Sequence, residues 1–464
     1  MARNTTVQAD LHAPPITRTL AEFVAQHPSR GWSDAVDHEA HRTFLNWLGC
    51  AVGAAHHEST QAALAAAQML QPAPQATVLG RQERVDMASA ALVNGIASHT
   101  FDFDDTHLKT IIHPAGPVAS ALLPLAEVTG ASGRQLIDAL VLGIDVSCRV
   151  GNVIYPDHYD RGWHITGSTG MLGAAAGCAR LLGLNADQTA MALGIAASQP
   201  VGLREQFGTM SKPLHPGAAA RTGLMAALMA QKGFTASPRA LEAPRGLLQV
   251  FSPKLAWHEA TDDLGKRFEI SFNTYKPFAC GIVVHPGIDA CVQLREQGIR
   301  PEDVERIELK VHSLVLELCG KKEPTDGLAA KFSIYHACAV GLIYGRAAEG
   351  EFSDEVVTSE AVVALRRKVV AEVDERINEE SADVTAVLRD GRRIHLFIEH
   401  AIGSTQKPMS DQALEAKFHG QADPVLGAAH AKELLACAWS VAQAPDVRRL
   451  VGCAVASAVA SSQA

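Results

Sequence analysis

The stretch that decides the fold is residues 170–182, GMLGAAAGCARLL, in which small residues and leucines recur at helical spacing. Apolar positions three and four apart form one face of a helix, and Ala and Gly allow two such faces to pack closely. The same character recurs in residues 62–70, 87–99, 133–149 and 187–198. Because few segments before residue 267 alternate polar with β-branched residues, we predict a large domain built of helices.

The pattern changes after about residue 267, where strand-like segments begin. Residues 304–311, VERIELKV, mix apolar and charged side chains as a half-exposed strand does, and residues 369–373 are a weaker candidate. Residues 384–388 and 394–398 flank Asp390-Gly391, a dipeptide that supplies the positive φ of a tight hairpin turn. Helical patterns return near Leu414 and over residues 429–442.

These patterns predict a mostly α protein with two domains. We expect a large, discontinuous all-helical domain over residues 1–267 and 403–464, and a smaller α+β lid domain inserted over residues 268–402. The two late helical stretches should then pack back on the first domain.

Composition and charge narrow the classes of function. The chain has 464 residues, of which 47% are hydrophobic and 20% charged, as in a folded globular protein of two domains. A net charge of −9 gives no reason to expect a basic face, so we expect no nucleic-acid partner. The nine cysteines are scattered, and no uncharged stretch is both long and apolar enough to span a bilayer. We therefore expect a cytoplasmic protein without a membrane partner.

His, Asp and Thr gather in residues 99–114. If a helix ran from residue 87 to about 106, then His99, Asp102 and Thr106 would share one face. Three carboxylates near a helix C-terminus are unfavourable because that end of the dipole is negative, so we infer that they serve a purpose. His113 precedes a proline, which favours extended backbone and hence a loop. The alternative is a solvated acidic helix end with surface histidines.

Further basic side chains precede Ala-rich helices. His164 is followed by small hydroxyl residues and glycines, which seat anions well at a helix N-terminus. Lys212 and His215 fall in a Pro/Gly-punctuated turn, where the helix dipole repels a lysine unless an anion lies between them. Lys276 falls at the junction of the two predicted domains, a favoured place for a ligand cleft. The alternatives are a helix cap, a buried histidine and exposed loop residues.

Other chemistries fit the sequence less well. It contains no HExxH motif, no zinc-spaced His/Cys set, no Walker A loop and no GxSxG elbow. Asp104-Asp105 with nearby histidines is a weak candidate for a divalent metal site. We expect no metal and no other cofactor.

Together, these segments resemble the MmgE/PrpD family. The matching motifs keep the family order over roughly residues 18–455; they are Asp102-Phe-Asp-Asp-Thr106 with His113-Pro114, Gly162-Trp-His164, Lys212-Pro-Leu-His215-Pro-Gly217, Lys276 with His285, and Ala330-Lys-Phe-Ser333 with Tyr335. The family includes 2-methylcitrate dehydratases, cis-aconitate decarboxylases and iminodisuccinate epimerases. The resemblance implies a large helical domain with an α+β lid, a homodimer, and a site without an iron–sulfur cluster.

The resemblance also implies a small polycarboxylate as substrate. We assign catalytic roles to His113, His164, Asp102 and Lys212, and substrate binding to Thr106, Lys276 and His215. The lysines would hold carboxylates and stabilise developing charge, and the histidines would move protons near neutral pH. Asp102 would orient one of the histidines.

The exact reaction is a separate expectation. Residues 277–281, Pro-Phe-Ala-Cys-Gly, differ from the lid segment expected in the decarboxylases. We therefore expect a hydro-lyase of the 2-methylcitrate dehydratase type, with an epimerase or decarboxylase as the second candidate. A non-catalytic relative that binds polycarboxylates is the alternative from another class.

Overall fold

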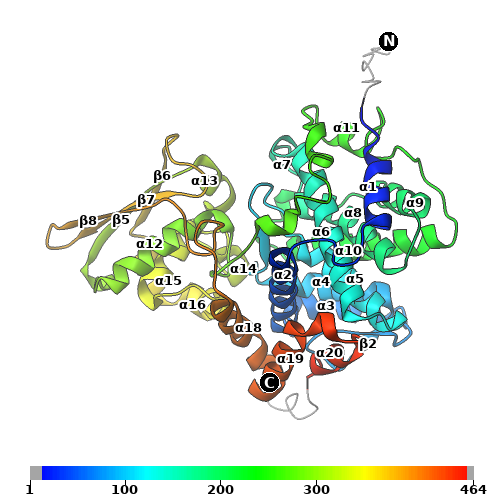
Figure 1. The fold of residues 1–464 in the computed structure, drawn as a ribbon. Helices are drawn as coiled ribbons and strands as arrows, with labels where there is room; N and C mark the ends of the chain where they lie inside the picture. Colours follow the sequence, from blue (N-terminus) through cyan, green and yellow to red (C-terminus); the bar gives the residue numbers. More distant parts are fainter. Residues whose placement is uncertain (1–12, 457–464) are drawn as a thin grey trace.

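Long helices rich in Ala and Gly form the centre of the protein. The computed structural model describes residues 13–456, and Figure 1 shows these helices together in the larger part of the molecule. They are α4 (Met87–Thr100), α5 (Ala115–Thr129), α6 (Gly133–Ile154), α8 (Ile165–Leu181) and α10 (Ser211–Gln231). Around them lie α1 (Ile16–Gln26), α2 (Asp34–Gly53), α3 (Glu58–Gln68), α7 (Asp157–Asp160), α9 (Ala186–Ala197) and α11 (Leu247–Phe251). The helices predicted over residues 62–70, 87–99, 133–149, 170–182 and 187–198 are confirmed.

Two glycines let α4 and α10 touch. A Cβ on Gly95 would lie 2.5 Å from the Cα of Gly217, and a Cβ on Gly217 would lie 2.4 Å from the carbonyl oxygen of Leu92. Neither distance leaves room for a side chain, so only glycine permits this approach. Because α4 ends beside His99 and α10 begins beside Lys212, the contact fixes two candidate site residues relative to each other.

The prediction of helices alone before residue 267 is wrong in detail. Strands β1 (Ala76–Thr77) and β2 (Arg84–Val85) pair with each other, and β3 (Asp105–His107) pairs antiparallel with β4 (Asn273–Tyr275). Strands of two or three residues are too short to show a period of two in the sequence. Although β4 falls in the segment assigned to the lid domain, it is hydrogen-bonded to β3 of the helical part.

A four-stranded sheet forms the smaller part of the molecule (Figure 1). Its order is β6 (Val369–Val373), β5 (Val304–Val311), β7 (Ala382–Leu388) and β8 (Arg393–Ile398), and only the β5–β6 pair is parallel. Gly391, at φ 87°, closes the predicted hairpin, so the expected strands and turn are confirmed. The helices of this part are α12 (His285–Glu296), α13 (Ser313–Cys319), α14 (Gly327–Ala330), α15 (Ile334–Tyr344), α16 (Asp354–Thr358) and α17 (Glu360–Arg366).

After the sheet, the chain returns to the helical part. Helices α18 (Asp411–Leu426) and α19 (Ala428–Trp439) pack against α2, and α20 (Arg448–Cys453) follows them. An ion pair joins Arg42 to Asp411, and the Nζ of Lys417 donates to the Oδ1 of Asn46 at 2.7 Å. The division of the chain at residues 267/268 and 402/403 stays a prediction.

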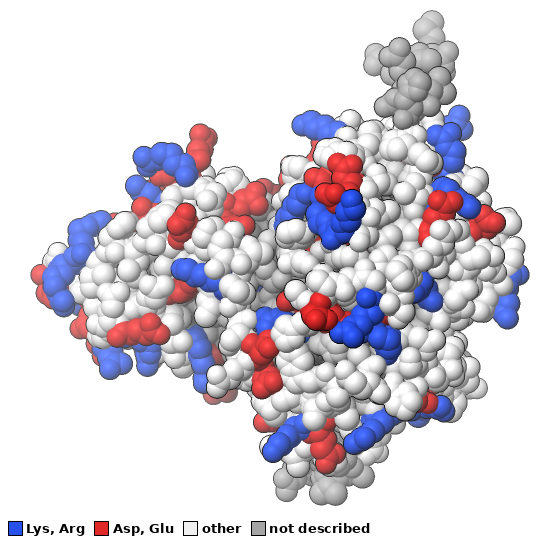
Figure 2. Space-filling view, in the orientation of Figure 1, with Lys and Arg blue, Asp and Glu red and all other residues white. Residues whose placement is uncertain are grey.

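Short 3-10 helices connect the main elements. They are η1 (Arg204–Gln206), η2 (Trp257–Ala260), η3 (Glu269–Phe272), η4 (Ile282–Val284), η5 (Pro301–Asp303), η6 (Glu349–Phe352) and η7 (Val441–Gln443). No helix within residues 13–456 has the length and apolarity needed to cross a lipid bilayer. On the face seen in Figure 2, positive and negative side chains are interspersed.

Candidate active site

The acidic segment forms a buried turn between α4 and β3. The predicted helix to residue 106 is wrong, because α4 ends at Thr100 and Asp102 has a φ of 50°. That left-handed backbone cannot continue a right-handed helix, although Asp tolerates it better than most residues. The side chains of Asp102, Asp104 and Asp105 are all buried. The alternative of a solvated acidic helix end is therefore excluded.

Asp102 binds two lysines that come from distant segments. Its Oδ1 lies 2.9 Å from the Nζ of Lys212 and 2.5 Å from the Nζ of Lys276, and Lys276 also donates to the Asp102 carbonyl at 3.1 Å. Burial acts to raise the pKa of Asp102, but the two ammonium groups hold it well below its usual range. Two cations and one anion leave a net charge of +1, which suits an anionic ligand.

Two expectations about this cluster need correction. Lys212 is the second residue of α10, not part of a preceding turn, because Pro213 is tolerated in the first turn of a helix. The expected anion beside Lys212 is the Asp102 carboxylate itself. Asp102 contacts lysines here and has no hydrogen bond to a histidine within residues 13–456, so the expected orientation of a histidine by Asp102 is not observed.

His113 is held in one tautomer. It lies in the loop before α5, as predicted, and its Nδ1 is 2.7 Å from the carbonyl oxygen of Asp105. A carbonyl only accepts hydrogen bonds, so Nδ1 carries the proton and the neutral ring has its lone pair on Nε2. Burial lowers the pKa of His113 to about 3, with help from Lys276. His113 is therefore a neutral imidazole that can accept a proton.

His164 and His215 form a second pair of imidazoles. His164 lies immediately before α8, as the sequence predicts, and its Nδ1 is 2.8 Å from the Nδ1 of His215 on α10. One ring must donate and the other accept. Burial lowers the pKa of His164 well below its usual range and that of His215 to about 4. Both rings are thus neutral.

His99 is a third buried imidazole to which the sequence analysis gave no role. It is the penultimate residue of α4, and its Nδ1 lies 2.6 Å from the Oδ2 of Asp104. Its ring centroid is 4.8 Å from that of His113 and 5.6 Å from that of His164. The sequence signal that could have indicated a role for His99 was its position three residues before Asp102. Lys417 gave no local signal, yet its Nζ donates to the carbonyl of Phe103 in the same turn at 2.6 Å.

Five of the seven assigned residues line one small cavity. Its free volume is about 30 Å³, enough for about two water molecules. Its walls are Asp102, His113, His164, Lys212 and Lys276 together with Ile111, Tyr159, Phe207, Gly281, Ile282, Val283, Leu318, Cys319 and Phe332. The rings of His113 and His164 are 6.3 Å apart, so both imidazoles belong to the same compartment.

Thr106 and His215 lie outside this lining. Thr106 places its Oγ1 3.3 Å from the Nδ1 of His113, and His215 contacts His164. Both are buried behind the two histidines that face the cavity. Their assigned role in substrate binding stays a prediction, and their contacts favour positioning of the histidines.

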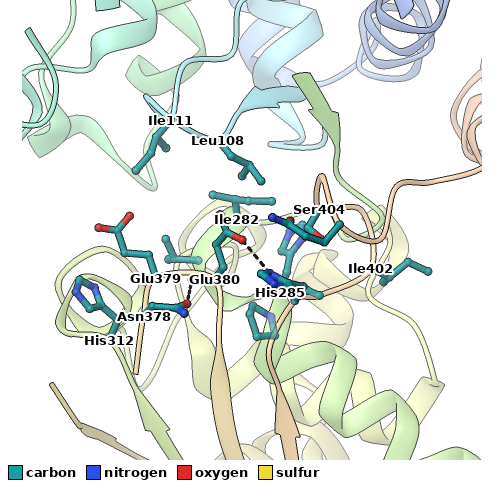
Figure 3. A pocket seen from close by; sticks show the side chains of 15 residues that line it. Leu108, Ile111, Ile282, His285, His312, Asn378, Glu379, Glu380, Ile402 and Ser404 are labelled. Atoms are coloured by element: carbon teal, nitrogen blue, oxygen red, sulfur yellow. Dashed lines mark hydrogen bonds and ion pairs between the residues drawn. The ribbon is translucent and has the colours of Figure 1, made fainter. Parts of the chain in front are cut away.

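A larger cavity of about 570 Å³ adjoins the small one. The two share Ile111, Ile282 and Val283 in their walls. Figure 3 shows Leu108 and Ile111 facing the larger cavity from one side, and Ile282 and His285 facing it from the other. The larger cavity therefore lies next to the site of the histidines and lysines.

The residues that could hold a metal ion are His99, His113 and His164. Each offers a ring nitrogen, and these atoms lie within 4.8 Å of one another. However, His99 already binds Asp104, and two lysine ammonium groups adjoin the same cavity and oppose a further cation. The weak candidate pair Asp104-Asp105 is also engaged, because Asp105 accepts from Asn273 at 2.7 Å and from the backbone of Ala115.

The fold and the cavity define a mostly helical protein with a buried site where two lysines, a carboxylate and two histidines meet. Residues 18–260 match the MmgE/PrpD N-terminal domain, and residues 278–443 match the MmgE/PrpD C-terminal domain. The chain therefore belongs to the MmgE/PrpD family.

Several enzymes of this family are similar to the chain over most of their length. Human cis-aconitate decarboxylase is 30% identical over 75% of this chain and 76% of its own length. Cis-aconitate decarboxylase of Aspergillus terreus is 27% identical over 84% of this chain and 86% of its own length. The 2-methylcitrate dehydratase of Salmonella typhimurium (strain LT2) is 24% identical over 79% of this chain and 82% of its own length. These names cover two different reactions.

Proposed function

We propose that this protein is a lyase that acts on a small di- or tricarboxylic acid by moving a proton next to a carboxylate. The observation that supports this most is the meeting of two lysines and two neutral imidazoles in one buried cavity. Lysine ammonium groups are charge partners for carboxylates, and imidazoles transfer protons near neutral pH.

Lys212 and Lys276 would hold the substrate carboxylates. Their charge is partly balanced by Asp102, so the cavity would attract an anion without leaving two bare ammonium groups buried. Negative charge that develops on a substrate carboxylate would be stabilised by the same ammonium groups in a place from which most water is excluded.

His113 and His164 would move the proton. The lone pair on the Nε2 of His113 can accept a proton from a substrate carbon, and the imidazolium that results can give one back. A bound carboxylate raises the pKa of a nearby imidazole, because the opposite charge favours the protonated ring. The substrate itself would thus bring the pKa values of these neutral histidines towards the range in which they exchange protons. We propose His113 as the proton-transfer residue and His164 as its partner on the other side of the substrate.

Decarboxylation is the reaction that we put first. The relatives named cis-aconitate decarboxylase have the higher identities, and part of the cavity wall is apolar, formed by Ile111, Ile282 and Phe332 among others. An apolar wall disfavours a charged carboxylate and favours its departure as carbon dioxide. The electrons of the broken C–C bond stay on the substrate, and an imidazolium supplies the proton that completes the product.

Dehydration is the second candidate. The 2-methylcitrate dehydratases are 23–24% identical, and residues 277–281 differ from the segment expected in decarboxylases. Here one imidazole takes the proton from the carbon next to a carboxylate, and the C–H electrons form the double bond. Hydroxide leaves as water with a proton from the second ring, which is an imidazolium when the substrate is bound.

The test is an incubation of the purified protein with cis-aconitate, 2-methylcitrate and iminodisuccinate in deuterated water. Carbon dioxide release with one deuterium in the product supports decarboxylation, and loss of water supports dehydration. Deuterium exchange without net change would indicate an epimerase instead. No turnover of any of the three, together with no binding of citrate, would overturn the proposal.

We also propose that these side chains suffice without a cofactor. The lysines supply the positive charge that a metal ion would otherwise supply. Dialysis against a chelator should therefore leave the turnover rate unchanged, and a rate restored only by added metal would contradict this part of the proposal.

A further inference from the structure

The buried carboxylate of Asp104 lies between two imidazoles. Its Oδ2 accepts a hydrogen bond from the Nδ1 of His99 at 2.6 Å, and its Oδ1 lies 3.6 Å from the Nδ1 of His113. That second oxygen is buried and has no hydrogen-bond partner in the described part of the chain. No lysine or arginine among residues 13–456 lies within 4 Å of Asp104, so the two imidazoles are its nearest basic partners.

His99 is placed to hold this carboxylate and nothing else. Its side chain is fully buried and does not line the cavity, and its Nε2 has no hydrogen-bond partner among the residues that the structure describes. Because Nδ1 donates to Asp104, the neutral ring has its proton on that side. A carboxylate fixed by a neutral imidazole keeps its full negative charge and points it at His113.

We propose that His99 and Asp104 are positioning residues for His113: His99 holds the Asp104 carboxylate in place, and that carboxylate is the buried counter-ion of His113 whenever His113 carries a proton. This inference rests on the proposed function, because it concerns the proton that His113 exchanges with the substrate. The proton moves between a substrate carbon and the Nε2 of His113. The Nδ1–H of His113 keeps its bond to the Asp105 carbonyl, and Asp104 stays ionised throughout.

The other charges around His113 make a counter-ion necessary. The titratable groups that face it are His99 on α4, Asp102, Asp104 and Asp105 in the turn to β3, His164 before α8, Lys212 on α10, and Lys276 after β4. The two lysines oppose a proton on His113, and the charge of Asp102 is already taken up by them. Burial raises the pKa of Asp105 to about 7, which makes it a weak counter-ion. Asp104 is therefore the carboxylate that can balance an imidazolium at this position.

Four variants of the full-length protein test the inference. Asp104→Asn removes the charge and keeps the shape, and His99→Ala removes the hydrogen bond that holds Asp104. His99→Asn lacks the ring but keeps an N–H that can donate to Asp104, so it is the rescue variant. Glu127→Gln is the matched control, because it also neutralises a buried carboxylate. Glu127 lies about 18 Å along α5 from Ala115, whose backbone N–H binds Asp105 beside the site.

We expect Asp104→Asn to lower kcat on the active substrate by about 10²- to 10⁴-fold with little change in KM. The limb of the kcat/KM pH profile that reports His113 should move to lower pH by about one to three units, because loss of the neighbouring anion makes the imidazolium more acidic. His99→Ala should also lower kcat and move this limb of the pH profile to lower pH. His99→Asn should recover most of the lost kcat. The double variant His99→Ala/Asp104→Asn should be no worse than Asp104→Asn alone, since His99 acts through Asp104.

A second measurement does not depend on turnover. The wild type should take up protons when it binds citrate, and the Asp104→Asn variant should take up fewer. Calorimetry in buffers of different ionisation enthalpy measures this uptake. If the wild type is active and the Asp104→Asn variant has the same kcat, pH profile and proton uptake, the roles given to His99 and Asp104 are overturned. The proposed function would stand in that case. Wild type that neither turns over nor binds polycarboxylates would overturn the proposed function, and with it the exchange that the inference describes.

Discussion

The Nδ1 atoms of His164 and His215 lie 2.8 Å apart in the buried interior, so the tautomer of one ring dictates that of the other. His215 comes from α10, the helix that also carries Lys212. The orientation of His164 in the cavity therefore depends on the same helix that places a lysine there.

Replacing His215 with Ala should lower kcat more than it changes KM. The substitution leaves the Nδ1 of buried His164 without a partner, which costs about 1–3 kcal/mol and frees the ring to turn. Steady-state kinetics with thermal unfolding measure both effects. His215→Asn is the control, because its amide can again pair with His164. A large rise in KM with unchanged kcat would instead support the substrate-binding role first assigned to His215.

Lys212→Met should weaken the binding of a polycarboxylate by about 10- to 150-fold, because a hydrogen bond to a charged group contributes about 1.5–3 kcal/mol. Citrate titration by calorimetry measures the Kd. Lys109→Met, which removes an exposed lysine paired with Glu259, is the control and should bind citrate as the wild type does. Equal affinity of the two variants would show that Lys212 does not hold the ligand.

Asp105→Asn should stabilise the protein more at pH 8 than at pH 4. Burial and the Asp104 charge raise the pKa of Asp105 from its ordinary value of 3.8 to about 7. The folded state thus favours the protonated carboxyl, and the stability that this brings is present below about pH 4 and is lost as the pH rises to 7. The variant has no such loss, so the difference in Tm, variant minus wild type, should grow over this range. Asp34→Asn removes an exposed carboxylate as a control, and a difference that shrinks with pH would contradict the assignment.

Gly95→Ala should destabilise the protein by about 1–3 kcal/mol and lower activity. The added methyl group meets the backbone of Gly217, so α4 and α10 must separate and carry His99 and Lys212 with them. Gly420→Ala on α18 is the matched control: the position is open, and alanine there should be neutral or stabilising by up to about 1 kcal/mol. Denaturant unfolding of both variants measures the difference, and equal stabilities would refute the close contact.

Long periodic segments could be predicted from the sequence, and short or non-local features could not. Strand β5 begins and ends at the predicted residues, because eight residues are enough to show alternation. The end of α4 was misplaced, since the left-handed backbone at Asp102 has no marker comparable to glycine. The start of α10 was misplaced because its prolines were interpreted as a turn, whereas Pro213 sits in the first helical turn.

The members of the site could be predicted better than their contacts. Each motif carries its own residues, so His113, His164 and Lys212 could be proposed one segment at a time. Which carboxylate meets which base depends on the packing of α4, α8 and α10 and on the β3–β4 pair, whose residues lie about 170 positions apart. Hence Asp102 was paired with a histidine in the prediction and with lysines in the structure, and Lys417 was not anticipated.

The cavity that holds the histidines and lysines has room for about two water molecules, and a tricarboxylic acid is several times larger. Ile282 and Val283 line both this cavity and the larger one, so we expect this short 3-10 segment to move when a molecule of that size enters or leaves. The turnover rate would then be set partly by the movement of this apolar wall. Residues that never touch the reacting carbon could therefore govern how fast the protein works.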